Sequence, residues 1–109
     1  MTDFPKCVLI VTAEIDLSVE EDWNIWYDEV HLPEALACPG VLGGQRYLSM
    51  GEGSVTTLGD KSTTAARTYT TIYELAGPEA LETDEFKAMR GWYQFTGKIK
   101  ATTRVMGAR

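Results

Sequence analysis

The sequence predicts an α+β fold in which strands and helices follow one another in the order β-α-β-β-α-β. Three observations support this class. Strand-like apolar segments recur along the 109 residues, amphipathic segments lie after the first and third of them, and glycine or proline marks the segment ends. This order is the split βαβ arrangement, in which right-handed crossovers place the first and third strands side by side. Both helices then cover one face of an antiparallel sheet.

The first strand and the first helix have clear sequence signals. Residues 6–13 are apolar on both alternating sets of positions, which is typical of a central strand that is covered on both faces. Ser18 and Glu21 have the spacing of a capping box, so a helix is expected to begin at Val19. The apolar positions of this helix recur at helical spacing and define its inner side: Val19, Trp23, Trp26, Tyr27 and Val30.

The end of the first helix and the second strand are marked by proline and glycine. Pro33 disfavours helical geometry in the residue before it, so we expect a break or kink near His31 and a short restart over residues 33–37. Residues 41–50 predict a second strand. Its Gly43–Gly44 pair indicates a bulge or a close approach of another segment to the backbone.

A loop, a third strand and a second helix are expected next. Residues 51–66 are rich in Gly, Ser and Thr and predict a long flexible loop that borders the functional pocket. Residues 67–76 predict the third strand, because Thr, Tyr and Ile are enriched there. Residues 78–82 can form a helical turn, and Thr83 or Asp84 can cap a longer helix.

The C-terminal part of the chain completes the sheet and leaves one of its faces bare. The second helix carries four large side chains on its inner side, namely Phe86, Met89, Trp92 and Tyr93, and the final strand is expected over residues 98–106. The strand at residues 7–11 is apolar on the face that no helix covers. A second copy of the sheet is the simplest cover for that face, so the sequence predicts a homodimer.

Composition excludes several classes of function. A formal net charge of −6 disfavours nucleic-acid binding, and the longest apolar stretch is too short to cross a bilayer. We expect a soluble, cytoplasmic chain in which Cys7 and Cys38 remain free thiols. One histidine and two distant cysteines lack the spacing of metal ligands, so no metal site is expected.

The run from Trp23 to Tyr47, WNIWYDEVHLPEALACPGVLGGQRY, resembles the first-helix signature of the dimeric α/β-barrel superfamily. Within that superfamily it is most similar to EthD-related and muconolactone-isomerase-like small proteins. In these, a Trp-Tyr helix leads into a histidine, a Pro-Gly turn and an Arg-Tyr strand. The Tyr69–Leu75 strand and the helix around residues 85–87 fit the same layout.

This resemblance implies a single ferredoxin-like domain over residues 1–109 that pairs its sheet with a second copy as a dimeric α/β barrel. It implies no single activity, because the superfamily includes isomerases, cyclases, lyases, cofactor-free monooxygenases, haem enzymes and proteins without a known reaction. His31 is the only histidine. The chain therefore departs from the cyclases that use several histidines and from the members that bind haem through a histidine on the second helix. We expect no cofactor.

His31 is the first candidate for a catalytic group, because imidazole usually titrates near neutrality and is the commonest general acid or base. Three tyrosines could polarise a substrate oxygen: Tyr27, one helical turn before His31, and Tyr69 and Tyr73, which share a strand face. A structural interpretation is also open for each of them. His31 could interact with carbonyls at a helix end, and the tyrosines could belong to the core or to cross-strand pairs.

Further residues are candidates for binding the substrate: Trp23, Trp26, Arg46, Tyr47, Phe86, Met89 and Trp92. Aromatic rings on the helices could line a pocket for a hydrophobic ligand, although such a stripe is more often core. Arg46 could bind a carboxylate with both arms of its guanidinium group, or it could form an exposed ion pair. Cys38 has no second histidine to activate it, so a nucleophilic role is not expected.

These observations predict a cofactor-independent enzyme of the isomerase, lyase or cyclase type. It would transfer a proton through His31 on an oxygenated hydrophobic metabolite, in a pocket between helices and sheet. Two alternatives stay open. One is a cofactor-free monooxygenase in the same pocket, and the other is a non-catalytic dimeric module that binds ligands or serves in a stress response.

Overall fold

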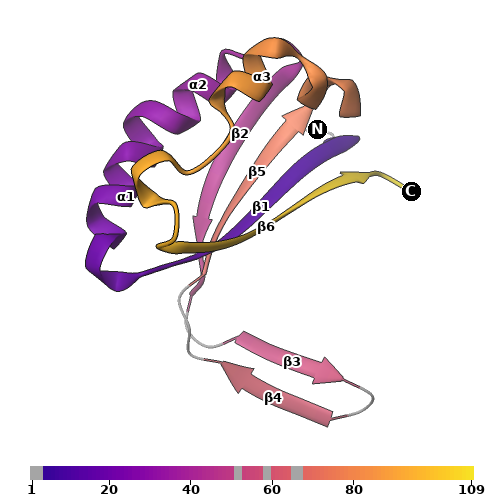
Figure 1. Ribbon diagram of the computed structural model, residues 1–109. Helices are drawn as coiled ribbons and strands as arrows, with labels where there is room; N and C mark the ends of the chain where they lie inside the picture. The colour runs from indigo at the N-terminus through magenta and orange to yellow at the C-terminus, as the bar shows by residue number, and fades with distance from the viewer. Residues whose placement is uncertain (1–3, 51–52, 58–59, 65–67) are drawn as a thin grey trace.

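The computed structural model describes residues 4–50, 53–57, 60–64 and 68–109. Four strands form one antiparallel sheet in the order β2-β5-β1-β6 (Figure 1). Their bounds are β1 Cys7–Ile15, β2 Val41–Leu48, β5 Tyr69–Leu75 and β6 Ile99–Gly107. The first and third predicted strands, β1 and β5, lie side by side, so the predicted split βαβ arrangement is confirmed.

The helical segments lie together on one face of this sheet (Figure 1). Between β1 and β2 the chain forms a 3₁₀ turn at Leu17–Val19, α1 at Glu20–Trp26, a π turn at Tyr27–His31 and α2 at Leu32–Leu36. Between β5 and β6 it forms a 3₁₀ turn at Pro78–Glu82, α3 at Asp84–Met89 and a 3₁₀ turn at Tyr93–Phe95. No helix among the described residues is long and apolar enough to cross a membrane.

The first helix begins almost where expected, but the predicted capping box does not form. Ser18 lies inside the 3₁₀ turn, and its hydroxyl donates to Asp16 Oδ1 at 2.6 Å. The backbone N–H of Ser18 donates to the same oxygen at 2.9 Å. These two hydrogen bonds hold the pKa of Asp16 below its usual value, the hydroxyl bond contributing most. Asp16 therefore caps the 3₁₀ turn, and α1 itself begins at Glu20 without a side-chain cap.

The helix is irregular at His31, where a break or kink was expected, but the irregularity is a π turn, and the chain stays helical through Leu32 into the short helix α2. Leu32 is helical and donates its N–H to the carbonyl of Tyr27, five residues back, which is the π-type bond. Proline offers no N–H and crowds the carbonyl four residues before it, and a widened turn relieves that crowding without ending the helix. Residues four apart, Tyr27 and His31, are consequently both buried, whereas Val30 is 42% exposed rather than on the inner side.

Both expectations for the glycine pair of β2 are confirmed. The register of β2 against β5 shifts between Val41 and Gly43, which is a bulge. At Gly44 a Cβ atom would lie 2.9 Å from Cδ1 of Tyr73 and 3.2 Å from Cδ2 of Leu36, so only glycine lets α2 and the Tyr73 ring approach this closely.

The segment predicted as a loop contains two strands, β3 (Gly53–Thr57) and β4 (Asp60–Thr64). They pair antiparallel with each other and project away from the four-stranded sheet (Figure 1). The loop prediction is therefore wrong for these ten residues, because their threonines suit a strand better than their low apolar content suggests. The remaining residues of 51–66 lie outside the described part, and the mobility of the segment stays a prediction.

The second helix is capped as predicted but is shorter. Thr83 Oγ1 accepts the N–H of Phe86 at 3.1 Å, and the helix ends at Met89. Gly91 then adopts a φ of +106°, which ends helical geometry. Tyr93, predicted on the inner side, is exposed, and the buried aromatic side chain of this segment is Phe95.

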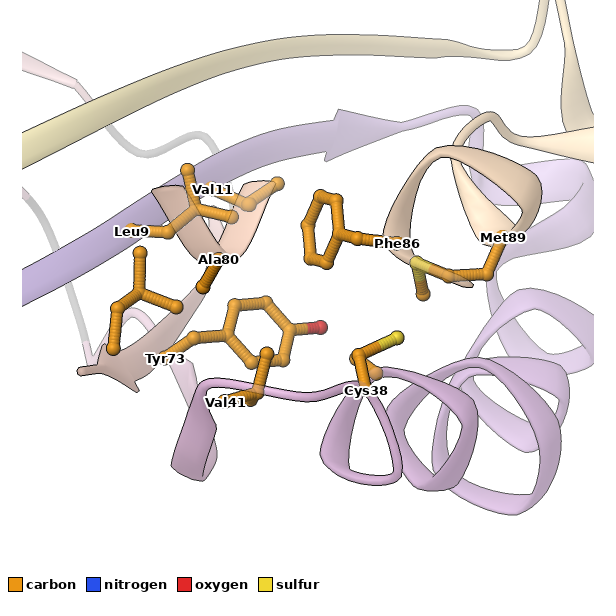
Figure 2. Packing of buried hydrophobic residues seen from close by; sticks show 10 residues of the cluster. Leu9, Val11, Cys38, Val41, Tyr73, Ala80, Phe86 and Met89 are labelled. Atoms are coloured by element: carbon orange, nitrogen blue, oxygen red, sulfur yellow. The ribbon is translucent and has the colours of Figure 1, made fainter. Parts of the chain in front are cut away.

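The core lies between the sheet and the helices. Alternate residues of β5 point to the helices and are buried, with Tyr69, Thr71, Tyr73 and Leu75 on that side. One cluster joins β1 and β5 to α2 and α3 and is drawn in Figure 2: Leu9, Val11, Ala35, Cys38, Val41, Tyr73, Leu75, Ala80, Phe86 and Met89. The second joins Ala13, Trp23, Tyr27, Tyr69 and Phe95. On the other sheet face, Val8, Ile10 and Ile72 are half-buried, and no helix in the described part of the chain covers that face.

Candidate functional site

A cavity of about 360 Å³ lies between the sheet and the helical segments, a volume in the range of small-ligand pockets. Strand residues of β1, β5 and β6 form one wall, and the π turn, α2 and the region around α3 form the other. The residues around it are mostly apolar: Leu9, Val11, Tyr27, His31, Ala35, Tyr73, Leu81, Phe86, Met89, Arg90, Gly91, Trp92 and Thr103. Six of the predicted site residues meet here: Tyr27, His31, Tyr73, Phe86, Met89 and Trp92.

His31 enters the cavity wall from the last position of the π turn, so it is not the helix end that the structural interpretation requires. Its imidazole stacks on Trp26 with ring centroids 4.5 Å apart, and the Tyr27 ring meets it edge-on at 4.8 Å. The side chain is only 7% exposed, and its Nδ1 has no hydrogen-bond partner among the described residues. A buried polar atom without a partner is unusual and indicates a place for a ligand group or a water.

Burial, together with a smaller contribution from the positive charge of Arg46, lowers the pKa of His31 to about 4. The expectation that this imidazole titrates near neutrality is therefore wrong for the ligand-free chain. At pH 7 the ring is neutral. A neutral imidazole has one nitrogen that accepts a proton or a hydrogen bond and one that donates.

Two tyrosine hydroxyls face each other beside the imidazole. The hydroxyl oxygens of Tyr27 and Tyr73 are 3.0 Å apart in a buried hydrogen bond, in which either can donate. Figure 2 shows the Tyr73 hydroxyl directed toward the space between Phe86, Cys38 and Met89. Burial, followed by the nearby Tyr27, raises the pKa of Tyr73, so its hydroxyl keeps its proton and can donate to a ligand oxygen.

Tyr69 and Tyr47 were predicted in the site but lie elsewhere. Tyr69 shares the helix-facing side of β5 with Tyr73, yet four residues along a strand separate them by about 13 Å. Its hydroxyl accepts from Asn24 Nδ2 at 3.0 Å and donates to Glu20. Tyr47 pairs with Thr70 on the opposite sheet face and is 53% exposed, because alternation allows only one of two adjacent strand residues to face the helices.

Trp23 and Trp26 do not line the cavity but pack against residues that do. Trp23 is fully buried and contacts the rings of Tyr27 and Tyr69 edge-on, with centroids 5.5 and 5.0 Å away. The Trp26 ring stacks on the imidazole of His31 and also packs near the ring of Phe95. The structural interpretation of the aromatic stripe is therefore confirmed for these two tryptophans, which fix the orientation of Tyr27 and His31.

Arg46 forms the ion pair that the sequence analysis considered, but in a largely buried position. One guanidinium nitrogen donates to Asp28 Oδ1 at 2.7 Å and another to Asn24 Oδ1 at 2.7 Å. The group lies 4.3 Å from the ring centroid of Tyr27 and 5.0 Å from that of Trp23, within the range of cation–π contacts. Arg46 thus ties β2 to α1, and it does not line the cavity as a carboxylate-binding group.

The cavity wall also contains residues that the sequence pattern does not assign to the site, among them Arg90, Leu81 and Thr103. A signal for Arg90 was present, because it follows Phe86 by four residues, the spacing at which helical side chains meet. Its guanidinium carbon lies 5.4 Å from the Phe86 ring centroid, and one nitrogen donates to the Leu81 carbonyl at 2.6 Å.

The remaining candidates do not add chemistry to this cavity. Burial, and then the carboxylates of Glu85 and Glu34, raise the pKa of the Cys38 thiol, which donates to the Glu34 carbonyl. Such a thiol is a poor nucleophile. Both cysteines are free. Within the described ranges, no three His, Cys, Asp or Glu side chains are grouped so as to hold a metal ion.

The sheet order and the one-sided helical layer define the ferredoxin-like α+β class, and solved structures of the same fold confirm the expected resemblance at this level. An antibiotic biosynthesis monooxygenase matches with a TM-score of 0.62 and 15% identity over 94% of this chain and 98% of its own. An ethyl tert-butyl ether D (EthD) family protein from Bacillus halodurans matches with a TM-score of 0.60 and 18% identity, covering 94% and 99%.

SnoaB from Streptomyces nogalater, a cofactor-independent oxygenase, matches with a TM-score of 0.58 and 11% identity over 95% of this chain and 94% of its own. No protein-family model matches the sequence, and no curated protein matches it either. At these identities the likenesses show the fold alone.

Proposed function

We propose that this chain is a cofactor-independent enzyme of the isomerase, lyase or cyclase type, which moves a proton with His31 on a small oxygenated hydrophobic metabolite. One observation carries the proposal. A buried imidazole with an unpartnered nitrogen and a pair of tyrosine hydroxyls lie in the wall of the same mostly apolar cavity. A base, a hydrogen-bond donor for oxygen and an apolar enclosure are the parts that proton transfer next to a carbonyl requires.

The reaction begins with the neutral His31, which takes a proton from a carbon next to a substrate carbonyl. Tyr73 or Tyr27 donates a hydrogen bond to the carbonyl oxygen, where negative charge develops. The electron pair of the broken C–H bond becomes part of an enolate. Return of the proton from imidazolium to another carbon completes an isomerisation, whereas loss of a leaving group beside the enolate completes an elimination.

The low pKa of His31 restricts which substrates can react. A pKa of about 4 means that an isolated imidazolium at pH 7 costs about 4 kcal/mol, at 1.36 kcal/mol for each pH unit. An enolate held in the same cavity offsets this cost, because opposite charges attract strongly where water is excluded. The site therefore favours reactions in which the proton stays paired with the anion and is not released to solvent.

Replacement of His31 by glutamine tests this function. We expect His31→Gln to lower kcat/KM by about 10²–10⁴ on the substrate found by screening lactones, enols and hydroxy-carbonyl compounds, since general acid–base groups contribute about that factor. Tyr27→Phe keeps the ring and removes one hydroxyl, and a smaller loss is expected. Leu81→Met, an apolar change in the same wall, is the matched control and should retain most activity. Wild-type turnover by His31→Gln would disprove the proposal.

A second candidate is a cofactor-free monooxygenase in the same cavity. It is favoured by the fold shared with SnoaB, which is a cofactor-independent oxygenase. Here His31 would deprotonate a substrate methylene, the carbanion would react with O₂, and the resulting hydroperoxide would lose water to leave a carbonyl group. Stoichiometric O₂ uptake with the substrate would identify this reaction. Ligand binding without turnover, unchanged in His31→Gln, would instead favour the non-catalytic binding module.

We also propose that the chain acts in the cytoplasm as a homodimer joined through its sheet faces. The register of β1 with β5 and β6 aligns Val8, Ile10 and Ile72 on the sheet face that carries no helix among the described residues. Met106 pairs with Val8 on the same face and is 46% exposed. Apolar side chains aligned on one open face favour burial against an identical face.

A further inference from the structure

We propose that Arg90 is an anion-binding residue at the mouth of the cavity, so that the substrate carries a carboxylate as well as the oxygen that meets His31. This inference rests on the proposed function, because it concerns the same cavity. Arg90 is exposed and yet belongs to the cavity wall, which places it where the cavity meets solvent. A cation in that position is reached by one end of a ligand whose other end is enclosed.

The guanidinium group of Arg90 is held in place by two other residues of the cavity wall. One nitrogen donates to the Leu81 carbonyl at 2.6 Å, and the guanidinium carbon lies 5.4 Å from the Phe86 ring centroid. An arginine with a fixed guanidinium group loses less side-chain freedom when it binds an anion. Arg90 is therefore organised for binding before the ligand arrives.

Most donors of Arg90 remain available. An arginine has five N–H donors, and the bond to Leu81 uses one of them. Among the described residues, no carboxylate lies within ion-pair distance of Arg90, whereas Arg46 is committed to Asp28 and Lys87 to Glu82. The carboxylate-binding role that the sequence analysis considered for Arg46 thus fits Arg90 better.

The chemistry of this position favours a carboxylate. A guanidinium group binds a carboxylate through two parallel hydrogen bonds, which match its planar shape. The chain as a whole carries a formal charge of −6, so its overall field repels an anionic ligand. A local cation at the mouth is then what separates anionic from neutral substrates. The other cation near the site, Arg46, does not line the cavity.

Two rigid probes separate this inference from the proposed function. The first, 6-hydroxy-2-naphthoate, has a hydroxyl for the imidazole and tyrosine groups and a carboxylate for Arg90. The second, 6-hydroxy-2-naphthamide, has the same shape without the charge. Their dissociation constants are measured by calorimetry for the wild-type chain and for Arg90→Gln, Arg90→Lys and Lys87→Gln. The lysine variant keeps the charge but not the paired donors, and Lys87→Gln removes a nearby charge outside the cavity.

We expect Arg90→Gln to weaken the naphthoate about threefold to tenfold and to leave the naphthamide unchanged, since a solvent-exposed ion pair is modest in strength. Arg90→Lys should lie between the two, and Lys87→Gln should match wild type. Equal weakening of both probes in Arg90→Gln, or the same loss in Lys87→Gln, overturns the inference. Binding of the naphthamide with no preference for the naphthoate overturns it as well, but leaves the proposed function standing. Binding of neither probe overturns the inference too, whereas the proposed function is decided by the turnover of His31→Gln.

Discussion

Protonation of His31 should destabilise the folded chain between pH 6.5 and pH 4. The pKa of this imidazole is about 4 in the folded chain, against 6.5 when it is solvated. Between these values the unfolded state binds a proton that the folded state does not. The free energy of unfolding contributed by this difference is fully present above pH 6.5 and is lost as the pH falls to about 4. A difference of about 2.5 units corresponds to at most about 3 kcal/mol, at 1.36 kcal/mol for each unit.

Urea unfolding from pH 4 to pH 7.5 measures this effect in the wild-type chain and in His31→Gln. The carboxylates of the chain titrate in the same range, but they are common to both proteins and cancel in the difference. We expect the stability of wild type relative to His31→Gln to rise by about 1.4 kcal/mol for each pH unit inside the window and to be flat above it. A pH-independent difference would refute the burial argument, because it would mean that His31 titrates alike in both states.

The second cause of the low pKa can be separated from the first. Arg46 disfavours imidazolium through its charge, and Arg46→Met removes the charge while retaining apolar bulk against Tyr27. The pKa of His31, followed by the chemical shift of its imidazole protons, should rise in this variant but stay below 6.5, because burial remains. Lys87→Met removes a charge that is not among the causes of the shift and should leave the pKa unchanged.

Three further outcomes are expected. Gly44→Ala should destabilise the fold by about 1–3 kcal/mol in thermal melts, because its Cβ would lie 2.9 Å from the Tyr73 ring, whereas Gly43→Ala has open space and should be neutral within about 0.5 kcal/mol. Light scattering should give a mass of about twice 12.1 kDa, and a stable monomer at micromolar concentration would contradict pairing through the sheet. Amide exchange should be faster in residues 51–66 than in residues 6–13, and equal protection in both segments would exclude a mobile hairpin.

The strands and their order could be predicted because each has a local signal that burial then reinforces. The apolar alternation of β1 and β5 and the proline or glycine at the segment ends are properties of the sequence alone. The β3–β4 hairpin could not be predicted because it lacks such a local signal. Its residues carry no apolar alternation, so strand pairing there has no counterpart in hydrophobic periodicity.

The candidate site could be predicted only in part, because residues that share a face need not share a cavity. Helical spacing correctly places Tyr27 beside His31. Strand alternation correctly places Tyr69 and Tyr73 on one face, but it says nothing about which helix residue each one meets. That choice depends on how α1 crosses the sheet, and on Arg46, Asn24 and Glu20, which hold Tyr69 at the far end.

The chemistry of the site originates in a backbone feature that follows from Pro33. A proline at this position removes one hydrogen bond of the helix, and the chain responds with the π turn that ends at His31. The widened turn lets an imidazole, and not Val30, point to the core. Burial against Trp26 then keeps that imidazole neutral at pH 7. A solvated imidazole would instead have a pKa near 6.5. The π turn before Pro33 therefore places the candidate base where burial lowers its pKa.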